Sequence, residues 1–145
     1  MASIYTVDAS VFLNAFNPYE AGHAESRRFL EYLQAKAIPI IAPTLLIPEI
    51  AAAISRGSGN GTLAREFASR LESLPHLMLI PLDMVLAHQA VDVAAAHRLR
   101  GSDAVYVAVA LRFGSALATL DREQHDRAAG ALAIYYPAEA LTEIG

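Results

Sequence analysis

Apolar positions divide the chain into short continuous runs that alternate with longer segments of helical periodicity. Short aliphatic runs are typical of strands that are covered on both faces of a parallel sheet. Strands that alternate with helices predict an α/β fold with a mostly parallel sheet. The five predicted strands are Ile4–Val7, Ile38–Ala42, Leu77–Ile80, Ala116–Thr119 and Ala133–Tyr135.

The segments between these runs carry apolar residues at spacings of three and four, which predicts amphipathic helices. Three acids precede such segments and are natural N-caps: Asp8 before a helix from Val11, Asp83, and Asp121. Ser102 is expected to cap the helix that follows it. The run RGSGNG, residues 56–61, predicts a loop between two helices.

The composition is that of one globular domain over residues 1–145, with 54% hydrophobic and 18% charged residues. A chain of this size buries about two thirds of its surface, which is enough for one core. The absence of Cys excludes thiol nucleophiles, zinc knuckles and iron–sulfur clusters.

No membrane segment is expected, because prolines and Glu49 interrupt the longest apolar stretch, residues 38–54. The N-terminus lacks the pattern of a secretory signal, so we expect a cytoplasmic protein with no membrane partner.

The net charge of −4 argues against coating of nucleic acid by bulk electrostatics. All basic residues except Lys36 are Arg, which favours planar partners such as carboxylate or phosphate. Five of them fit RNA phosphates and solvated helix faces equally well: Arg27, Arg28, Arg56, Arg98 and Arg100.

Four acids stand at the margins of the most apolar segments: Asp8, Glu49, Asp103 and Asp121, here called the acidic quartet. Asp8 and Asp121 follow the first and fourth predicted strands, so their side chains converge if those strands are neighbours. A role as N-cap explains each of the two as well, and the two roles are compatible.

Glu49 lies within TLLIPEIAAAI, where an unpaired carboxylate is costly unless it faces the surface. Asp103 opens the apolar segment AVYVAVAL, where it either belongs to a site or favours the helix N-terminus. Four carboxylates in one pocket repel each other, and Mg²⁺ or Mn²⁺ would relieve that repulsion. Since the net charge is −4, the rest of the chain is neutral once the quartet is set aside.

Four ordered motifs, DASV, PEI, RGSDAVYVAVA and ATLDRE, resemble the PIN domain, and more narrowly the ribonuclease toxins of VapBC toxin–antitoxin modules. The resemblance extends from Ile4 to about Tyr136. It implies a three-layer α/β/α fold with a short parallel sheet of order 3-2-1-4-5. It also implies that the quartet forms the site, with Ser10 and Thr119 as neighbouring substrate-binding hydroxyls. Gln124 departs from the pattern, because an apolar residue is expected there, and this leaves open how the following helix is placed.

The family further implies cleavage of RNA phosphodiesters with Mg²⁺ or Mn²⁺. A bound metal polarises a phosphate oxygen and lowers the pKa of a coordinated water. Asp8 and Asp103 are the expected direct ligands, and Asp121 completes the metal shell or acts through water. Glu49 is expected to orient or deprotonate the attacking water.

Two other functions stay open at this stage. One is a phosphatase-like hydrolase with Asp8 as covalent nucleophile, although that chemistry usually needs DxD and position 10 is Ser. The other is a non-catalytic interaction module on the same fold, which has no need of four costly acids.

The resemblance implies two protein partners. Relatives pair as homodimers, and here the helix after Ser102 carries Tyr106 and Phe113 among small residues as a packing face. They are also inhibited by a VapB-type antitoxin, whose Arg or Lys would reach the acidic quartet.

Overall fold

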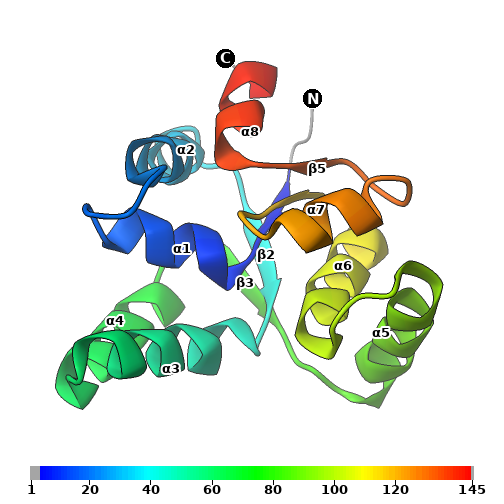
Figure 1. The fold of residues 1–145 in the computed structure, drawn as a ribbon, viewed down its shortest axis with the longest axis horizontal. Helices are drawn as coiled ribbons and strands as arrows, with labels where there is room; N and C mark the ends of the chain where they lie inside the picture. The colour runs from blue at the N-terminus through cyan, green and yellow to red at the C-terminus, as the bar shows by residue number, and fades with distance from the viewer. Residues whose placement is uncertain (1–3, 145) are drawn as a thin grey trace.

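The structure is a computed structural model that describes residues 4–144. Within these residues, five strands are each followed by one or two helices, eight helices in all (Figure 1). The strands are β1 (Tyr5–Val7), β2 (Ile40–Pro43), β3 (Leu77–Ile80), β4 (Ala116–Ala118) and β5 (Ile134–Tyr135). The helices are α1 (Ala9–Phe16), α2 (His23–Ala35), α3 (Leu46–Ser58), α4 (Gly61–Glu72), α5 (Met84–His97), α6 (Gly101–Phe113), α7 (Arg122–Ala128) and α8 (Pro137–Ile144).

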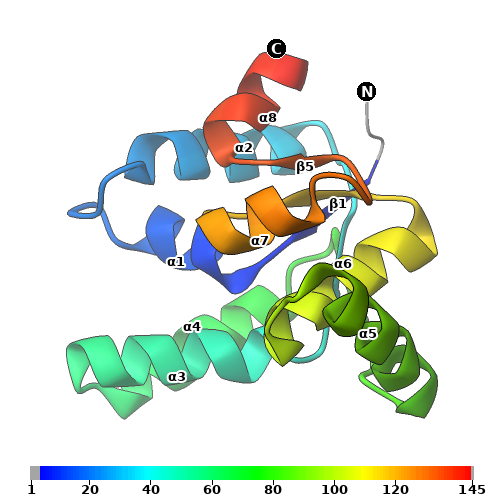
Figure 2. The ribbon, with the colours of Figure 1, turned by 45° about the vertical axis from the view of Figure 1, so that its right-hand side comes forward.

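The strands form one parallel sheet in the order β3-β2-β1-β4-β5, which confirms the predicted α/β fold and strand order. Figure 1 shows the sheet between α1 and α2 on one side and α5 and α6 on the other. The C-terminal helix α8 packs beside α2, so the last helix contacts the N-terminal part of the fold (Figure 2).

All five predicted strands are present, with shifts at their ends. The largest shift is in β2, which begins at Ile40 rather than Ile38. The amide of Ile38 donates to the carbonyl of Leu33 at 2.9 Å and closes the turn after α2, so it does not join the sheet. Register in the sheet places Tyr5 opposite Ala116 and aligns the ends of β1 and β4.

The middle of helix α6 is covered on all sides. Residues 104–110 are all buried, because the helix lies between the sheet and α5. The burial explains why residues 104–110 are apolar around the whole helix, whereas a surface helix is apolar on one face only.

Two predictions about helix starts are wrong, and one predicted loop is present but shorter. The predicted loop 56–61 is only the turn at Gly59 and Asn60, because α3 continues to Ser58 and α4 begins at Gly61. Gly59 has φ +68°, the left-handed conformation that commonly ends a helix. Ser102 lies inside α6, whose N-cap is Arg100, and α1 begins at Ala9 instead of Val11.

The predicted acidic caps are confirmed. The side chains of Asp8, Asp83 and Asp121 accept hydrogen bonds from the first-turn amides of α1, α5 and α7. Among residues 4–144, no helix is long and apolar enough to span a bilayer.

Candidate active site

Asp8 lies where β1 and β4 end side by side. Its amide donates to the Ala118 carbonyl at 3.1 Å, which extends the ladder by one residue. The side chain then turns out of the sheet to cap α1 and is only 5% exposed. The parallel register therefore holds one carboxylate at the carboxyl edge of the sheet.

Two hydroxyls fix the orientation of this carboxylate. Ser10 Oγ donates to Oδ1 of Asp8, and Thr119 Oγ1 donates to Oδ2. Both hydroxyl oxygens also accept backbone amides, from Leu120 at 2.9 Å and from Asp121 at 3.0 Å. Ser10 and Thr119 thus tie Asp8 to the loop after β4, and their contact with a substrate stays a prediction.

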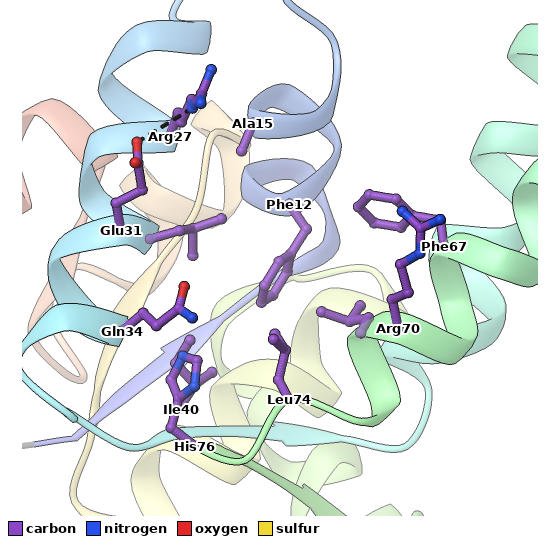
Figure 3. Close-up of a pocket in the computed structure, with 12 residues that line it drawn as sticks. Phe12, Ala15, Arg27, Glu31, Gln34, Ile40, Phe67, Arg70, Leu74 and His76 are labelled. Carbon is purple, nitrogen blue, oxygen red and sulfur yellow. Dashed lines mark ion pairs between the residues drawn. The ribbon is translucent and has the colours of Figure 1, made fainter.

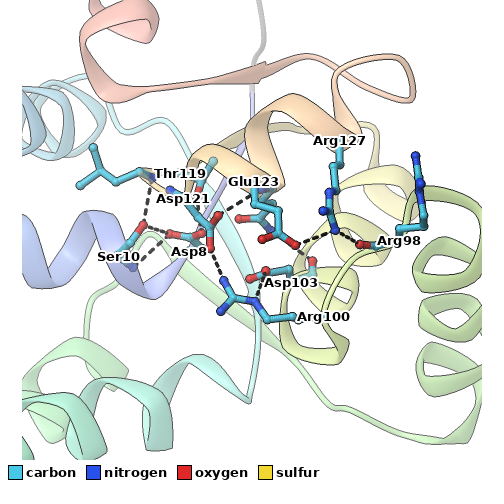
Figure 4. A network of polar contacts seen from close by, with 11 residues as sticks. Asp8, Ser10, Arg98, Arg100, Asp103, Thr119, Asp121, Glu123 and Arg127 are labelled. Atoms are coloured by element: carbon cyan, nitrogen blue, oxygen red, sulfur yellow. Dashed lines mark hydrogen bonds and ion pairs between the residues drawn. The ribbon is translucent and has the colours of Figure 1, made fainter.

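Asp103 and Asp121 approach the same place from α6 and from the N-terminus of α7 (Figure 4). Their side chains are 13% and 23% exposed. The guanidinium of Arg100 contacts both: Nε lies 3.3 Å from Asp103 Oδ2, and Nη2 lies 2.5 Å from Asp121 Oδ2.

Glu49 reaches the site from the first turn of α3 and is half-buried. The hydroxyl of Tyr106 donates to Glu49 Oε1 at 2.6 Å. The prediction that Tyr106 forms an exposed packing face with Phe113 is wrong, because Tyr106 is 2% exposed and Phe113 is 37% exposed. Tyr106 lies in the cavity wall beside the quartet, and the exposed positions of α6 lie at its two ends.

Burial dominates the electrostatics of these acids. It raises the pKa of Asp8 from its ordinary 3.8 to about 6, despite the hydrogen bonds from Ser10 and Thr119. Burial also raises the pKa of Glu49 and of Asp103, and the neighbouring charge of Asp121 adds to the effect at Asp103. Asp8, Glu49 and Asp103 are therefore held in a setting that resists their ionisation.

The whole quartet lines one open cavity of about 270 Å³. Its remaining wall comes from Ala9, Ser10, Leu13, Arg100, Ser102 and Tyr106. Carboxylate oxygens are the ligands that Mg²⁺ and Mn²⁺ prefer, so the donor chemistry fits a hard divalent cation. As the side chains stand, no three His, Asp or Glu residues of the described chain converge into a metal-binding group.

Three residues of this region were not assigned to the site by sequence: Arg100, Tyr106 and Gln124. Arg100 and Asp103 are three positions apart at the start of a helix, and this spacing predicts an ion pair. Gln124 is fully buried and its Nε2 donates to the Asp103 carbonyl at 3.1 Å, which fastens α7 to α6. No local signal predicts that contact or the one between Tyr106 and Glu49.

A second cavity, of about 300 Å³, lies apart from the carboxylates between α1, α2 and α4 (Figure 3). Apolar side chains such as Phe12, Leu30 and Phe67 line it. Arg27 and Glu31 form an ion pair of 3.3 Å at α2 on its wall. It contains no member of the quartet.

Solved structures share this fold. The toxin VapC20 of Mycobacterium tuberculosis, described as cleaving the sarcin-ricin loop, is 21% identical with a TM-score of 0.71, over 90% of this chain and 96% of that chain. VapBC2 of Rickettsia felis, bound to a DNA fragment from its promoter, is 15% identical with a TM-score of 0.70. The match covers 92% of this chain and 98% of that chain. FitAcB of Neisseria gonorrhoeae is 20% identical with a TM-score of 0.66. The match covers 92% of this chain and 97% of that chain.

Comparison with curated protein sequences gives no significant match. The sequence model of the PIN domain, in contrast, matches residues 5–131, which is most of the chain. This chain therefore belongs to the PIN domain family.

Proposed function

We propose that this protein is a metal-dependent endoribonuclease and the toxin half of a toxin–antitoxin pair. One observation carries the proposal: the acidic quartet, which comes from four separate elements, lines a single cavity in a PIN domain chain. The similarity of the fold to VapC20, a toxin described as cleaving the sarcin-ricin loop, supports a nuclease activity.

Asp8, Asp103 and Asp121 are the residues that would hold Mg²⁺ or Mn²⁺ in this proposal. When bound, such an ion stabilises the charge that develops on a phosphate and makes water more acidic. The chain's contribution is to keep Asp8 in one orientation through Ser10 and Thr119. A ligand held in this way loses little freedom when it binds a cation.

Glu49 is the proposed general base. Burial raises its pKa, and a base whose pKa is closer to the working pH accepts a proton more effectively. The hydrogen bond from Tyr106 fixes Oε1 and so aims the carboxylate at the cavity. Glu49 would accept the proton of the attacking water while that water's oxygen bonds to phosphorus. The bond from phosphorus to the ribose oxygen would break, and that oxygen would take up a proton from solvent.

The geometry weighs against the two other functions. A nucleophilic Asp8 usually needs a second acid two positions later, yet position 10 is Ser, whose hydroxyl donates to Asp8 Oδ1. A non-catalytic interaction module has no need of a buried Asp8 beside other acids, which costs free energy of folding.

Two protein partners belong to this proposal. An antitoxin is supported by the fold shared with the VapBC2 and FitAcB structures, and its Arg or Lys would enter the acidic quartet. Full inhibition by an antitoxin lacking that basic residue would contradict this mechanism.

We place the homodimer contact on α5. Met84, Val85 and Val91 are 67%, 58% and 62% exposed, and a twofold axis would pair this apolar surface with its own copy. Light scattering of Val91→Glu should give the 15.5 kDa mass of one chain where the parent gives twice that mass. A parent mass near 15.5 kDa at all concentrations would contradict the dimer.

The test of the activity is cleavage of a structured RNA by purified protein with Mg²⁺ or Mn²⁺. Asp8→Asn and Asp103→Asn should abolish cleavage, whereas Asp83→Asn, which changes an exposed cap outside the cavity, should retain it. Chelation with EDTA should stop the parent enzyme. Cleavage that survives in Asp8→Asn and Asp103→Asn would overturn the proposal.

A further inference from the structure

Among residues 4–144, Arg100 is the one basic residue in the wall of the acidic cavity. Its guanidinium lies between two members of the quartet, 3.3 Å from Asp103 and 2.5 Å from Asp121 (Figure 4). The proposed nuclease needs a divalent cation beside the same two carboxylates. A side-chain cation of the protein itself therefore occupies part of the place where that ion would bind.

The competition concerns individual oxygens. Asp121 uses Oδ1 to accept the amide of Gln124 at 3.1 Å and so caps α7. Its Oδ2 is the oxygen that Arg100 holds. Oδ1 keeps one lone pair beside the cap, whereas Oδ2 carries the guanidinium, so a cation that binds Oδ2 meets the positive charge of Arg100.

The backbone of Arg100 is fixed while its side chain is free to leave. The residue is the N-cap of α6, and its carbonyl accepts the amide of Ala104 at 2.9 Å. The side chain makes no capping bond and is 65% exposed, so solvent can take over the guanidinium at little cost. A divalent cation carries twice its charge and would repel it from the cavity.

We propose that Arg100 is an internal counter-ion that holds Asp103 and Asp121 together in the metal-free protein and must be displaced when the metal binds. The inference rests on the proposed function, because it assumes that the quartet binds a divalent cation. Arg100 is a positioning residue in this scheme, since it preserves the spacing of two ligands until the cation replaces it. The same contact sets a threshold of metal concentration for activity.

Binding of Mn²⁺ to the parent and to Arg100→Gln, measured by calorimetry without RNA, tests the inference. Arg100→Gln should bind Mn²⁺ about fivefold more tightly, because two partly exposed ion pairs together contribute roughly a factor of 2 to 30. Arg100→Lys should fall between the two, since a single ammonium cannot span both carboxylates as the planar guanidinium does. Arg112→Gln, an equal change of charge at the far end of α6, should bind within about twofold of the parent.

The outcomes separate the inference from the proposed function. Mn²⁺ binding that is lost in Asp103→Asn but equal in the parent and Arg100→Gln overturns the role of Arg100 and leaves the metal site standing. Weaker binding in Arg100→Gln also overturns it, because the guanidinium would then assist the metal. If none of these proteins binds Mn²⁺ in a way that depends on Asp103, the proposed function itself is overturned.

A second readout needs no metal. In EDTA, Arg100→Gln should melt at a lower temperature than the parent at neutral pH, because Asp103 and Asp121 then repel each other without a cation between them. Saturating Mn²⁺ should remove that difference. If Arg100→Lys and Arg100→Gln fold normally and Arg100→Gln melts at the same temperature as the parent in EDTA, the counter-ion role is contradicted.

Discussion

Replacing Asp8 with Asn should stabilise the metal-free protein at neutral pH. Asp8 is 5% exposed, and burial raises its pKa from 3.8 to about 6. The folded state therefore holds the proton more tightly than the unfolded chain does. This contribution to stability is complete below the unfolded pKa, falls as pH rises through the folded pKa, and is lost above it.

The magnitude follows from the size of the shift. About two pKa units at 1.36 kcal/mol each give a cost of about 3 kcal/mol for holding the charged Asp8 above pH 7. Asparagine has nearly the same shape and carries no charge, and its side-chain oxygen can accept the cap and hydroxyl hydrogen bonds of Ser10. At 145 residues, 3 kcal/mol corresponds to a rise in melting temperature of roughly 10 °C.

The assay is denaturant and thermal unfolding of both proteins in EDTA at pH 5 and pH 7.5. The gain from Asp8→Asn should be about 3 kcal/mol at pH 7.5 and about half of that at pH 5. Asp83→Asn is the matched control, because Asp83 caps α5 in an exposed position and accepts the Leu86 amide at 2.9 Å. A gain that is absent at pH 7.5, or equal at both pH values, would refute the reasoning from burial.

Three further predictions concern neighbouring groups. Mg²⁺ or Mn²⁺ should raise the melting temperature of the parent by binding only the folded cavity, and equal shifts in Asp8→Asn would place the ions elsewhere. Tyr106→Phe removes a hydrogen bond that lowers the pKa of Glu49, so the acid limb of the pH–rate profile should move to higher pH; an unmoved limb would argue against Glu49 as the base. Gln124→Leu should change the free energy of unfolding by less than about 1 kcal/mol, because it removes one hydrogen bond and one buried oxygen that has no partner among the described residues. Chemical denaturation checks this, and a loss above about 2 kcal/mol would show that fastening α7 to α6 dominates.

The sequence by itself determined the class of fold and the members of the acidic quartet. Five aliphatic runs of strand length separated by helical periodicity allow few architectures, since a parallel sheet must be covered on both faces. The quartet was visible because an acid beside an apolar segment is costly and needs a reason. The caps at Asp8, Asp83 and Asp121 were readable because a cap is a contact within three residues.

Only the tertiary structure decided how the quartet is held. Thr119 donates to Asp8 across 111 positions, Tyr106 to Glu49 across 57, and Arg100 to Asp121 across 21. Such contacts depend on the register of β1 against β4 and on the packing of α6 against the sheet, which no local pattern encodes. For the same reason Tyr106 was misplaced on an exposed face: the spacing of residues on a helix defines its faces, and the packing of neighbouring elements determines which face is buried.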